Sequence, residues 1–280
     1  MYKLYNSGLI ILILFFFQVI KAQDKKILVN NQQRAYSISV PKSYNGEIAV
    51  PLVFILHGYD NDVKSIKEYS GFNELSEKEG VITVYPYGSK NENDYYVWNA
   101  GNQYQEWSDN ADDVSFISTL IDSIKENYSI DTSAIYLIGH SNGAMMCYKL
   151  AAALSGKIAA VACLSGPMID ESKIPEYPVA VMHIHGDNDI IIPHTGTEQY
   201  GFKLPPIDHV IRNWLKWNNC SSVPAVLNYS KKVTALQWKG DKEVRFYLLH
   251  GAGHNWPSKA SSGWEASEFI WEFFKQNKKG

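Results

Sequence analysis

Apolar runs that are hydrophobic on both faces alternate with helix-like patterns through the middle and end of this chain. The segment 51–56, Pro-Leu-Val-Phe-Ile-Leu, lacks the alternation expected of a strand with one face in water. Such strands belong inside a parallel sheet that is covered on both sides. Similar or related strands are expected at 35–40, 50–57, 81–85, 134–139, 159–164, 179–185 and 244–249. The sequence therefore predicts an α/β fold with a mostly parallel central sheet flanked by helices.

The helices expected between these strands carry one apolar stripe each. The clearest covers 109–127, where isoleucines recur at helical spacing and Asp109, Asp112 and Asp113 crowd the first turn. Others are expected at 66–79, 142–154, 207–218 and 264–276. No repeat or low-complexity linker interrupts the chain, so residues 23–280 are predicted to form a single domain.

Residues 1–22 are predicted to be a signal peptide. Lys3 precedes an unbroken apolar run from Leu9 to Phe17, and Ala22 offers a small residue at a cleavage point. The run is shorter than the roughly 20 apolar residues that a membrane span needs. The mature protein is therefore expected to be secreted or periplasmic, with no stable membrane anchor after cleavage. An uncleaved anchor is the alternative.

Composition excludes some partners and cofactors. Lys and Arg number 26 against 29 Asp and Glu, a net charge of −3, so no polybasic surface for nucleic acid is expected. Cys147, Cys163 and Cys220 are odd in number and lack zinc-ligand spacing, and neither a metal nor an organic cofactor is expected. The 8 Trp and 18 Tyr suit a protein that binds sugars or aromatic acids, although packing alone would use many of them.

A candidate nucleophile lies in the segment Gly139-His140-Ser141-Asn142-Gly143, which matches G-x-S-x-G. A predicted strand precedes it and a predicted helix follows it. A strained turn at such a junction lifts the serine hydroxyl above the sheet edge. Ser141 is therefore the expected nucleophile.

Candidates for the acid and the base follow the serine in the order that this arrangement uses. Asp187 and Asp189 both follow the strand 179–185, and position alone leaves both open. His250 and His254 follow the strand 244–249, and the Gly-rich turn around His254 favours it as the base.

Two backbone N–H groups are candidates for an oxyanion hole. That of Tyr59 follows the segment Leu56-His57-Gly58 at the end of a buried strand, and that of Asn142 follows the serine. Taken alone, a simple tight turn would also explain His57-Gly58.

The surroundings of the site are predicted less directly. Trp98 and Trp107 lie in a polar loop, and Trp256 follows His254, so all three are expected to line the substrate cleft. Only residues 165–178 connect two strands where lipases often carry a lid, which predicts an open cleft. His183 and His185 share a strand face, but no third metal ligand is indicated.

Taken together, these motifs resemble the secreted serine esterases of the poly(3-hydroxybutyrate) depolymerase-like group, which includes feruloyl and acetyl-xylan esterases. The resemblance covers most of the chain after residue 22. It rests on Leu56-His57-Gly58, Trp98-Asn99-Ala100-Gly101, residues 112–117, Gly139–Met146, Ser165-Gly166-Pro167-Met168, His185–Asp189, Trp217–Cys220 and Gly253–Pro257.

The resemblance implies an α/β-hydrolase fold without a large lid, and a cofactor-independent hydrolysis through an acyl-enzyme. In the family pattern the acid is the Asp three residues after the Gly of a His-Gly pair, which selects Asp189, and the base precedes x-Trp-Pro, which selects His254. The implied substrates are feruloyl or acetyl esters of plant polysaccharide. Poly(3-hydroxybutyrate) depolymerisation, and polysaccharide binding without catalysis, are the alternatives.

The chain also departs from the family. Many relatives pair a cysteine in the region of Cys220 with a later one, and this chain has no such partner. Tyr59 and Asp60 replace the small residues or cysteine that are common after His-Gly, which puts the shape of the acyl pocket in doubt.

Overall fold

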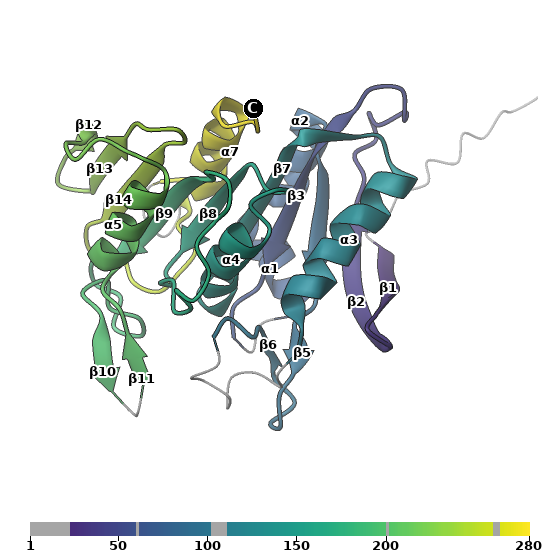
Figure 1. Ribbon diagram of the computed structural model, residues 1–280, viewed down its shortest axis with the longest axis horizontal. Helices are drawn as coiled ribbons and strands as arrows, with labels where there is room; N and C mark the ends of the chain where they lie inside the picture. Colours follow the sequence, from purple (N-terminus) through teal and green to yellow (C-terminus); the bar gives the residue numbers. More distant parts are fainter. Residues whose placement is uncertain (1–22, 60–61, 102–110, 200–201, 260–263) are drawn as a thin grey trace, which may run out of the picture.

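The computed structural model describes residues 23–59, 62–101, 111–199, 202–259 and 264–280 (Figure 1). The predicted signal peptide, residues 1–22, and Trp107 lie outside the described residues.

A ten-stranded sheet runs through the molecule in the order β1-β2-β4-β3-β7-β8-β9-β14-β13-β12. The strands are β1 (Gln23–Val29), β2 (Gln32–Ser39), β3 (Val50–Leu56), β4 (Ile82–Pro86), β7 (Ile130–His140), β8 (Ala160–Leu164), β9 (Ala180–Gly186), β12 (Ala225–Tyr229), β13 (Val233–Trp238) and β14 (Val244–Leu249). From β4 to β14 all neighbours pair in parallel, and both margins are antiparallel. The predicted mostly parallel α/β sheet is confirmed.

Helices cover both faces of this sheet and close two apolar cores. The helices are α1 (Val63–Ser70), α2 (Phe72–Glu79), α3 (Asp113–Asn127), α4 (Asn142–Ala153), α5 (Ile207–Trp217) and α7 (Ala266–Gln276). Helices α3, α4 and α5 lie on one face and α1, α2 and α7 on the other (Figure 1). Side chains of the first three helices fill one core, and those of the second three fill the other. Strands such as β3 are buried on both faces because each face meets a helix layer.

Two helix expectations need correction. The single helix expected at 66–79 is two helices, since Gly71 between them adopts the left-handed conformation with φ 64°. The helix expected from 109 begins at Asp113, and Asp112 is its N-cap, whose side chain accepts a hydrogen bond from Ser115 N.

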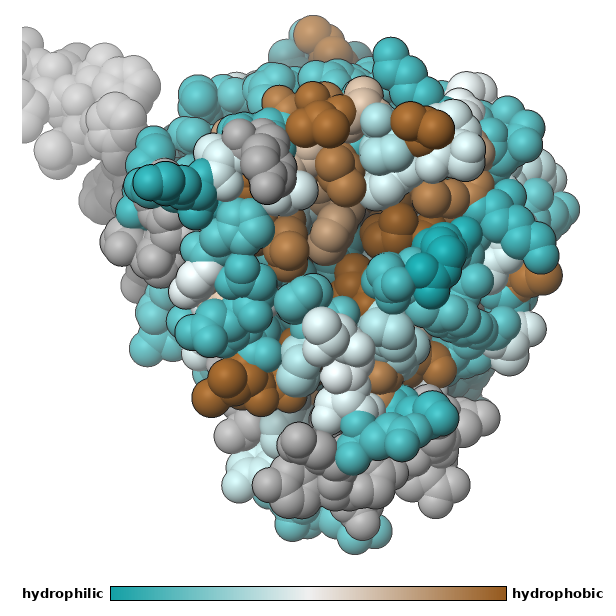
Figure 2. Space-filling view, turned by 90° about the vertical axis from the view of Figure 1, so that its left-hand side faces the viewer, coloured by the Kyte–Doolittle hydropathy of each residue, from teal (hydrophilic) through white to brown (hydrophobic). Residues whose placement is uncertain are grey.

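The strands missed from the sequence lie at the margins or outside the main sheet. β1 is rich in polar residues, and β12 is an edge strand whose Val226 and Leu227 are exposed. Figure 2 shows apolar side chains gathered on the upper part of the face that carries β12 and β13. Two small hairpins, β5–β6 (Ser89–Lys90 and Tyr96–Val97) and β10–β11 (Thr197–Gln199 and Phe202–Leu204), are also additional.

The connections above the carboxyl ends of the parallel strands decide what can reach that edge. Residues 165–178, between β8 and β9, contain no helix and no strand, so no large lid arises there. In the part of the chain that the structure describes, no helix is both long enough and apolar enough to cross a membrane.

Candidate active site

The junction between β7 and α4 holds Ser141 in a strained backbone conformation. Its φ is 57° and its ψ is −121°, which costs a non-glycine residue about 1–3 kcal/mol. Ser141 N–H donates to Leu164 O at 2.8 Å, which ties the turn to the neighbouring strand β8. At Gly143 a Cβ atom would overlap the backbone oxygens of Leu56 and His57, so only glycine lets α4 approach the end of β3 this closely.

A hydrogen-bonded chain links three of the predicted site residues. The distance from Ser141 Oγ to His254 Nε2 is 2.9 Å, and His254 Nδ1 lies 2.7 Å from Asp189 Oδ2. Asp189 follows β9 and His254 follows β14, which are parallel neighbours and therefore end at the same edge of the sheet. The structure thus brings together side chains that are 65 and 113 residues apart in sequence.

Asp189 is held as a carboxylate by converging donors. Its Oδ1 accepts hydrogen bonds from the backbone N–H groups of Ile191, at 3.0 Å, and Ile192, at 2.8 Å. Burial alone would raise the pKa of Asp189, but the hydrogen bonds from His185, His254 and Ile192 outweigh it and hold the pKa well below its usual range. An ionised Asp189 requires the proton of His254 on Nδ1, which leaves Nε2 free to accept from the Ser141 hydroxyl.

The ring of His140 packs beside His254, with 5.1 Å between the ring centroids. Burial lowers the pKa of His140 to about 3. The ring is therefore neutral at ordinary pH and does not oppose a positive charge on His254.

The rival acid and base form a pair of their own. His250 Nδ1 lies 2.8 Å from Asp187 Oδ2, and Gly251 N–H donates to Asp187 Oδ1 at 2.7 Å. Of the two candidate pairs, that of Asp189 and His254 is the one joined to Ser141, through the hydrogen bond between Ser141 Oγ and His254 Nε2.

His57 orients the peptide that carries the first expected oxyanion donor. His57 Nδ1–H donates to Gly58 O at 2.7 Å, and Gly88 N–H donates to His57 Nε2 at 2.9 Å. Burial lowers the pKa of His57 to about 4, which keeps the ring neutral as this pattern requires. Because a trans peptide directs its C=O and N–H in opposite directions, holding Gly58 O turns Tyr59 N–H away from His57. The sequence interpretation assigned no role to the His57 side chain, although its place in the His-Gly pair was the available signal.

Trp98 does not line an open cleft in this structure. Its side chain is 1% exposed, and its Nε1–H donates to His57 O at 3.0 Å. Trp98 N–H donates to Asn142 Oδ1 at 2.7 Å, and Asn142 Nδ2–H donates back to Trp98 O at 3.2 Å. The position of Trp98 in a polar loop suggested that its ring is exposed. These hydrogen bonds instead hold Trp98 between the end of β3 and the start of α4. Trp98 therefore links, through its hydrogen bonds to His57 and Asn142, the two segments that carry the expected oxyanion donors.

Trp256 is also buried, so its expected place in the cleft is not met either. It packs against Tyr69 and Phe72, and its Nε1–H donates to Ser267 Oγ at 3.3 Å. Trp256 follows His254 closely in sequence, but its ring lies outside the cleft because the chain after His254 turns into the core that α7 covers.

Other apolar and aromatic side chains are exposed around these residues. The ring of Tyr59 is half-buried and lies 5.7 Å from that of Tyr95, which is 40% exposed. Ile190 and Ile191 directly follow Asp189 and are 87% and 65% exposed. The sequence interpretation connected Tyr59 with the acyl pocket but missed Tyr95, Ile190 and Ile191. Ile190 and Ile191 could have been found from the sequence, because two isoleucines directly follow a candidate catalytic acid.

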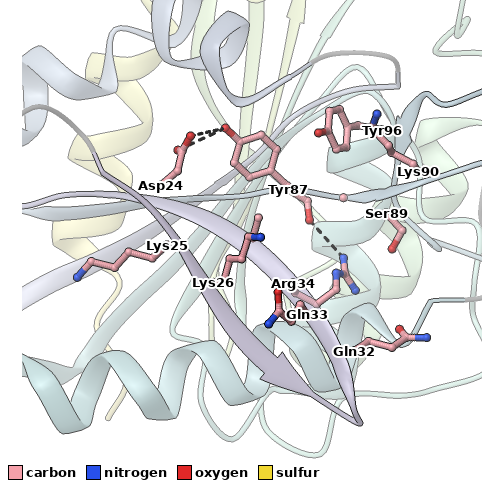
Figure 3. Close-up of a pocket in the computed structure, with 12 residues that line it drawn as sticks. Asp24, Lys25, Lys26, Gln32, Gln33, Arg34, Tyr87, Ser89, Lys90 and Tyr96 are labelled. Carbon is pink, nitrogen blue, oxygen red and sulfur yellow. Dashed lines mark hydrogen bonds between the residues drawn. The ribbon is translucent and has the colours of Figure 1, made fainter.

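A hollow of about 730 Å³ lies beside the His57 loop, between the β1–β2 hairpin and the segment that follows β4 (Figure 3). Lys26, Gln33, Tyr87 and Tyr96 are among the residues that line it. Arg34 also reaches it, but its guanidinium is committed to Asp113 and Tyr87 O. Gly88, another lining residue, is the one that donates to His57.

Cysteines and histidines elsewhere form no metal cluster among the residues described. No group of three or more His, Cys, Asp and Glu side chains gathers there in a way that could hold a metal ion. Cys147, Cys163 and Cys220 are free thiols. His183 and His185, the pair considered as metal ligands, hydrogen-bond to each other at 2.9 Å.

Comparison with known proteins places this chain among esterases. The phospholipase/carboxylesterase family pattern matches residues 47–201. The chain is 30% identical over 236 residues to the bifunctional acetylxylan esterase/xylanase XynS20E of Neocallimastix patriciarum, a match that covers 81% of this chain and 31% of that protein. It is 26% identical over 267 residues to feruloyl esterase D of Neurospora crassa, covering 89% and 83% of the two chains.

The solved structures agree in fold. Acetyl xylan esterase from Aspergillus awamori superposes with a TM-score of 0.66 at 16% identity, covering 90% of this chain and 99% of that one. A ferulic acid esterase superposes with a TM-score of 0.55 at 17% identity, covering 91% and 98%. The protein belongs to the phospholipase/carboxylesterase family and has the α/β-hydrolase fold.

Proposed function

We propose that the protein is a serine carboxylic-ester hydrolase that works through an acyl-enzyme at Ser141. The observation that carries the proposal is the continuous hydrogen-bonded chain from Ser141 Oγ through His254 to the buried carboxylate of Asp189. Family membership supports the same reaction class. No step of this reaction needs a metal or an organic cofactor.

The order of proton transfers follows from the tautomer of His254. Ser141 Oγ attacks the ester carbonyl carbon while its proton passes to His254 Nε2, and Asp189 stabilises the resulting imidazolium. The tetrahedral intermediate collapses, the C–O bond to the alcohol breaks, and His254 gives its proton to the leaving oxygen. Water then attacks the acyl-enzyme by the same route and releases the acid and free Ser141.

The negative oxygen of the tetrahedral intermediate would be bound by the backbone N–H groups of Tyr59 and Asn142. His57 and Trp98 support this assignment, since both hold the segments that carry these groups. Each such donor is worth roughly 3–4 kcal/mol to the transition state in enzymes of known mechanism.

The proposed substrates are feruloyl or acetyl esters of plant polysaccharide. Relatives named as acetylxylan and feruloyl esterases support this class. Tyr59, which carries an expected oxyanion donor, packs against Tyr95, and the exposed Ile190 and Ile191 directly follow Asp189, so these side chains offer aromatic and apolar contacts for a hydroxycinnamoyl ring. These four residues take the place of Trp98 and Trp256, which are buried.

Sugar residues of the polysaccharide farther from the ester would occupy the hollow beside the His57 loop, which Ser141, Asp189 and His254 do not line. Its tyrosine rings and the polar ends of Lys26 and Gln33 suit sugar faces and hydroxyl groups (Figure 3). Replacing both Lys26 and Gln33 by Ala should raise KM for acetylated xylan and leave KM for methyl ferulate unchanged. Equal effects on the two substrates would argue against sugar binding in this hollow.

Export is part of the proposal. The basic start at Lys3, the apolar run and Ala22 support a cleaved signal peptide. The first strand of the sheet begins directly afterwards, with Gln23 paired to Ile38. N-terminal sequencing of exported protein should give Gln23 as the first residue, and retention of residues 1–22 would contradict cleavage.

A substrate panel tests the proposed function. Purified protein should hydrolyse methyl ferulate and acetylated xylan and have little activity on long-chain triglycerides, and Ser141→Ala should be inactive on all of them. Turnover of 3-hydroxybutyrate oligomers alone would replace the proposed substrate class. Activity of Ser141→Ala equal to that of the wild type would refute the mechanism.

A further inference from the structure

A row of buried side chains extends from Asp189 away from the serine. His185 Nε2 lies 3.3 Å from Asp189 Oδ2 and 2.8 Å from Ile192 O. Behind it, His183 Nε2 lies 2.9 Å from His185 Nδ1, and Tyr148 OH lies 2.8 Å from His183 Nδ1. All of these side chains are fully buried, and their rings pack nearly parallel in two pairs.

The carbonyl oxygen of Ile192 determines which atom donates and which accepts in each hydrogen bond of this row. A carbonyl oxygen only accepts, so His185 must carry its proton on Nε2. That proton is directed at Ile192 O at 2.8 Å, and Asp189 Oδ2 lies beside it, 3.3 Å from Nε2. With one proton on each ring, His185 Nδ1 then accepts from His183 Nε2–H, and His183 Nδ1 accepts from the Tyr148 hydroxyl. Burial holds the pKa of His183 well below its usual range, which keeps that ring singly protonated.

This arrangement gives Asp189 a fourth N–H group in contact, which is the second at Oδ2, the oxygen that faces the base. The backbone N–H groups of Ile191 and Ile192 hold Oδ1, whereas His254 and His185 are the groups at Oδ2 among the residues that the structure describes. The two bonds to Oδ1 hold one end of the carboxylate, and His185 stands beside Oδ2 on the side away from His254, the residue that Asp189 has to orient.

We propose that His185 is a positioning residue for Asp189: its Nε2–H, which Ile192 O sets and His183 Nε2–H supports from behind, helps to fix the carboxylate oxygen that pairs with His254. The inference rests on the proposed function of Ser141, His254 and Asp189. His185 touches no substrate. It acts on the reaction through the geometry of Asp189.

Substitutions at residue 185 separate orientation from packing. His185→Leu removes the donor and should lower kcat on methyl ferulate by roughly 10- to 100-fold, the worth of one hydrogen bond to a charged group, with KM nearly unchanged. His185→Gln retains a side-chain N–H and should recover most of the lost kcat. Equal impairment of the Leu and Gln variants, or a wild-type kcat in the Leu variant, would overturn the proposal.

Asn218→Leu is the matched control for buried hydrogen bonds. Asn218 bonds Val179 N–H and Val179 O at the opposite end of the segment that includes β9, far along the strand from His185. This variant should lower the melting temperature and leave kcat unchanged. A loss of kcat equal to that of His185→Leu would mean that destabilisation of this strand explains both results.

Nuclear magnetic resonance gives a test that needs no turnover. In ¹⁵N-histidine-labelled wild-type protein, both His183 and His185 should carry their proton on Nε2, and a proton on Nδ1 of His185 would overturn the proposal. The downfield proton of His254 Nδ1–H should persist in His185→Gln and disappear in His185→Leu. Wild-type protein with these signals but no esterase activity would refute the proposed function and leave the role of His185 standing.

Discussion

Replacing Asp189 by Asn probes the geometry of the site through a single atom. Asp189 Oδ1 accepts two backbone N–H groups, so the amide oxygen of Asn has to remain in that position. The NH₂ group is then forced into the position of Oδ2, where His254 Nδ1–H and His185 Nε2–H both point. Donors would face donors, and His254 relieves the conflict by moving its proton from Nδ1 to Nε2.

The changed tautomer removes the base. With the proton on Nε2, His254 donates to Ser141 Oγ and can no longer accept the serine proton. The expected loss in kcat is about 10⁴-fold, equivalent to roughly 5.5 kcal/mol in activation free energy. The fold should survive, because the side chain keeps its size and its two backbone hydrogen bonds.

Steady-state hydrolysis of methyl ferulate measures this effect, with circular dichroism as the check on folding. Asp187→Asn is the matched control, since Asp187 pairs with His250 on the surface and should change kcat less than tenfold. A folded Asp189→Asn variant within tenfold of the wild type, or a larger loss from Asp187→Asn, would refute the tautomer argument.

Three further predictions concern stability. Trp98→Phe removes the donor to His57 O and should lower the free energy of unfolding by about 1–3 kcal/mol in denaturant titration; an unchanged value would contradict the link through Trp98. Gly143→Ala should lower the free energy of unfolding by about 3 kcal/mol or more, because its Cβ meets backbone oxygens. In the control Gly156→Ala the Cβ meets only a tyrosine ring at 3.8 Å, so the free energy of unfolding should change by less than about 1 kcal/mol. Similar melting temperatures of the two variants would refute the close approach at Gly143. Because the pKa of Asp189 is lowered in the folded protein, its ionised form stabilises the fold at pH values above the ordinary Asp pKa of about 4. The difference in free energy of unfolding between wild type and Asp189→Asn should therefore shrink as the pH falls below about 4. A difference that does not depend on pH would contradict the lowered pKa.

Patterns that depend on local sequence predicted the central part of the fold well. Strands such as β3 are apolar on both faces, and the turn around Ser141 needs glycines, so both leave a clear mark in the sequence. Edge strands leave a weaker mark, because they are less buried and need no regular apolar pattern: β1 is rich in polar residues, and β12 exposes Val226 and Leu227. Gly71 could break a helix or be accommodated within it, and the sequence does not distinguish the two outcomes.

The surroundings of the site depend on contacts between distant segments. Trp98 was expected to be exposed because its neighbours are polar, yet its burial comes from His57 and Asn142, which are 41 and 44 residues away. The role of His185 likewise depends on Ile192 O and on a ring behind it on the same strand. Such roles follow from three-dimensional hydrogen-bond directions, which residue type and spacing do not encode.

Covalent labelling of Ser141 is the most direct test of the proposed nucleophile. A fluorophosphonate probe should add one group per molecule, and peptide mass spectrometry should locate it on Ser141. Ser141→Ala should remain unlabelled while folding normally, and His254→Ala should label far more slowly because the serine loses its base. Labelling at another residue, or equal labelling of wild type and Ser141→Ala, would contradict the account.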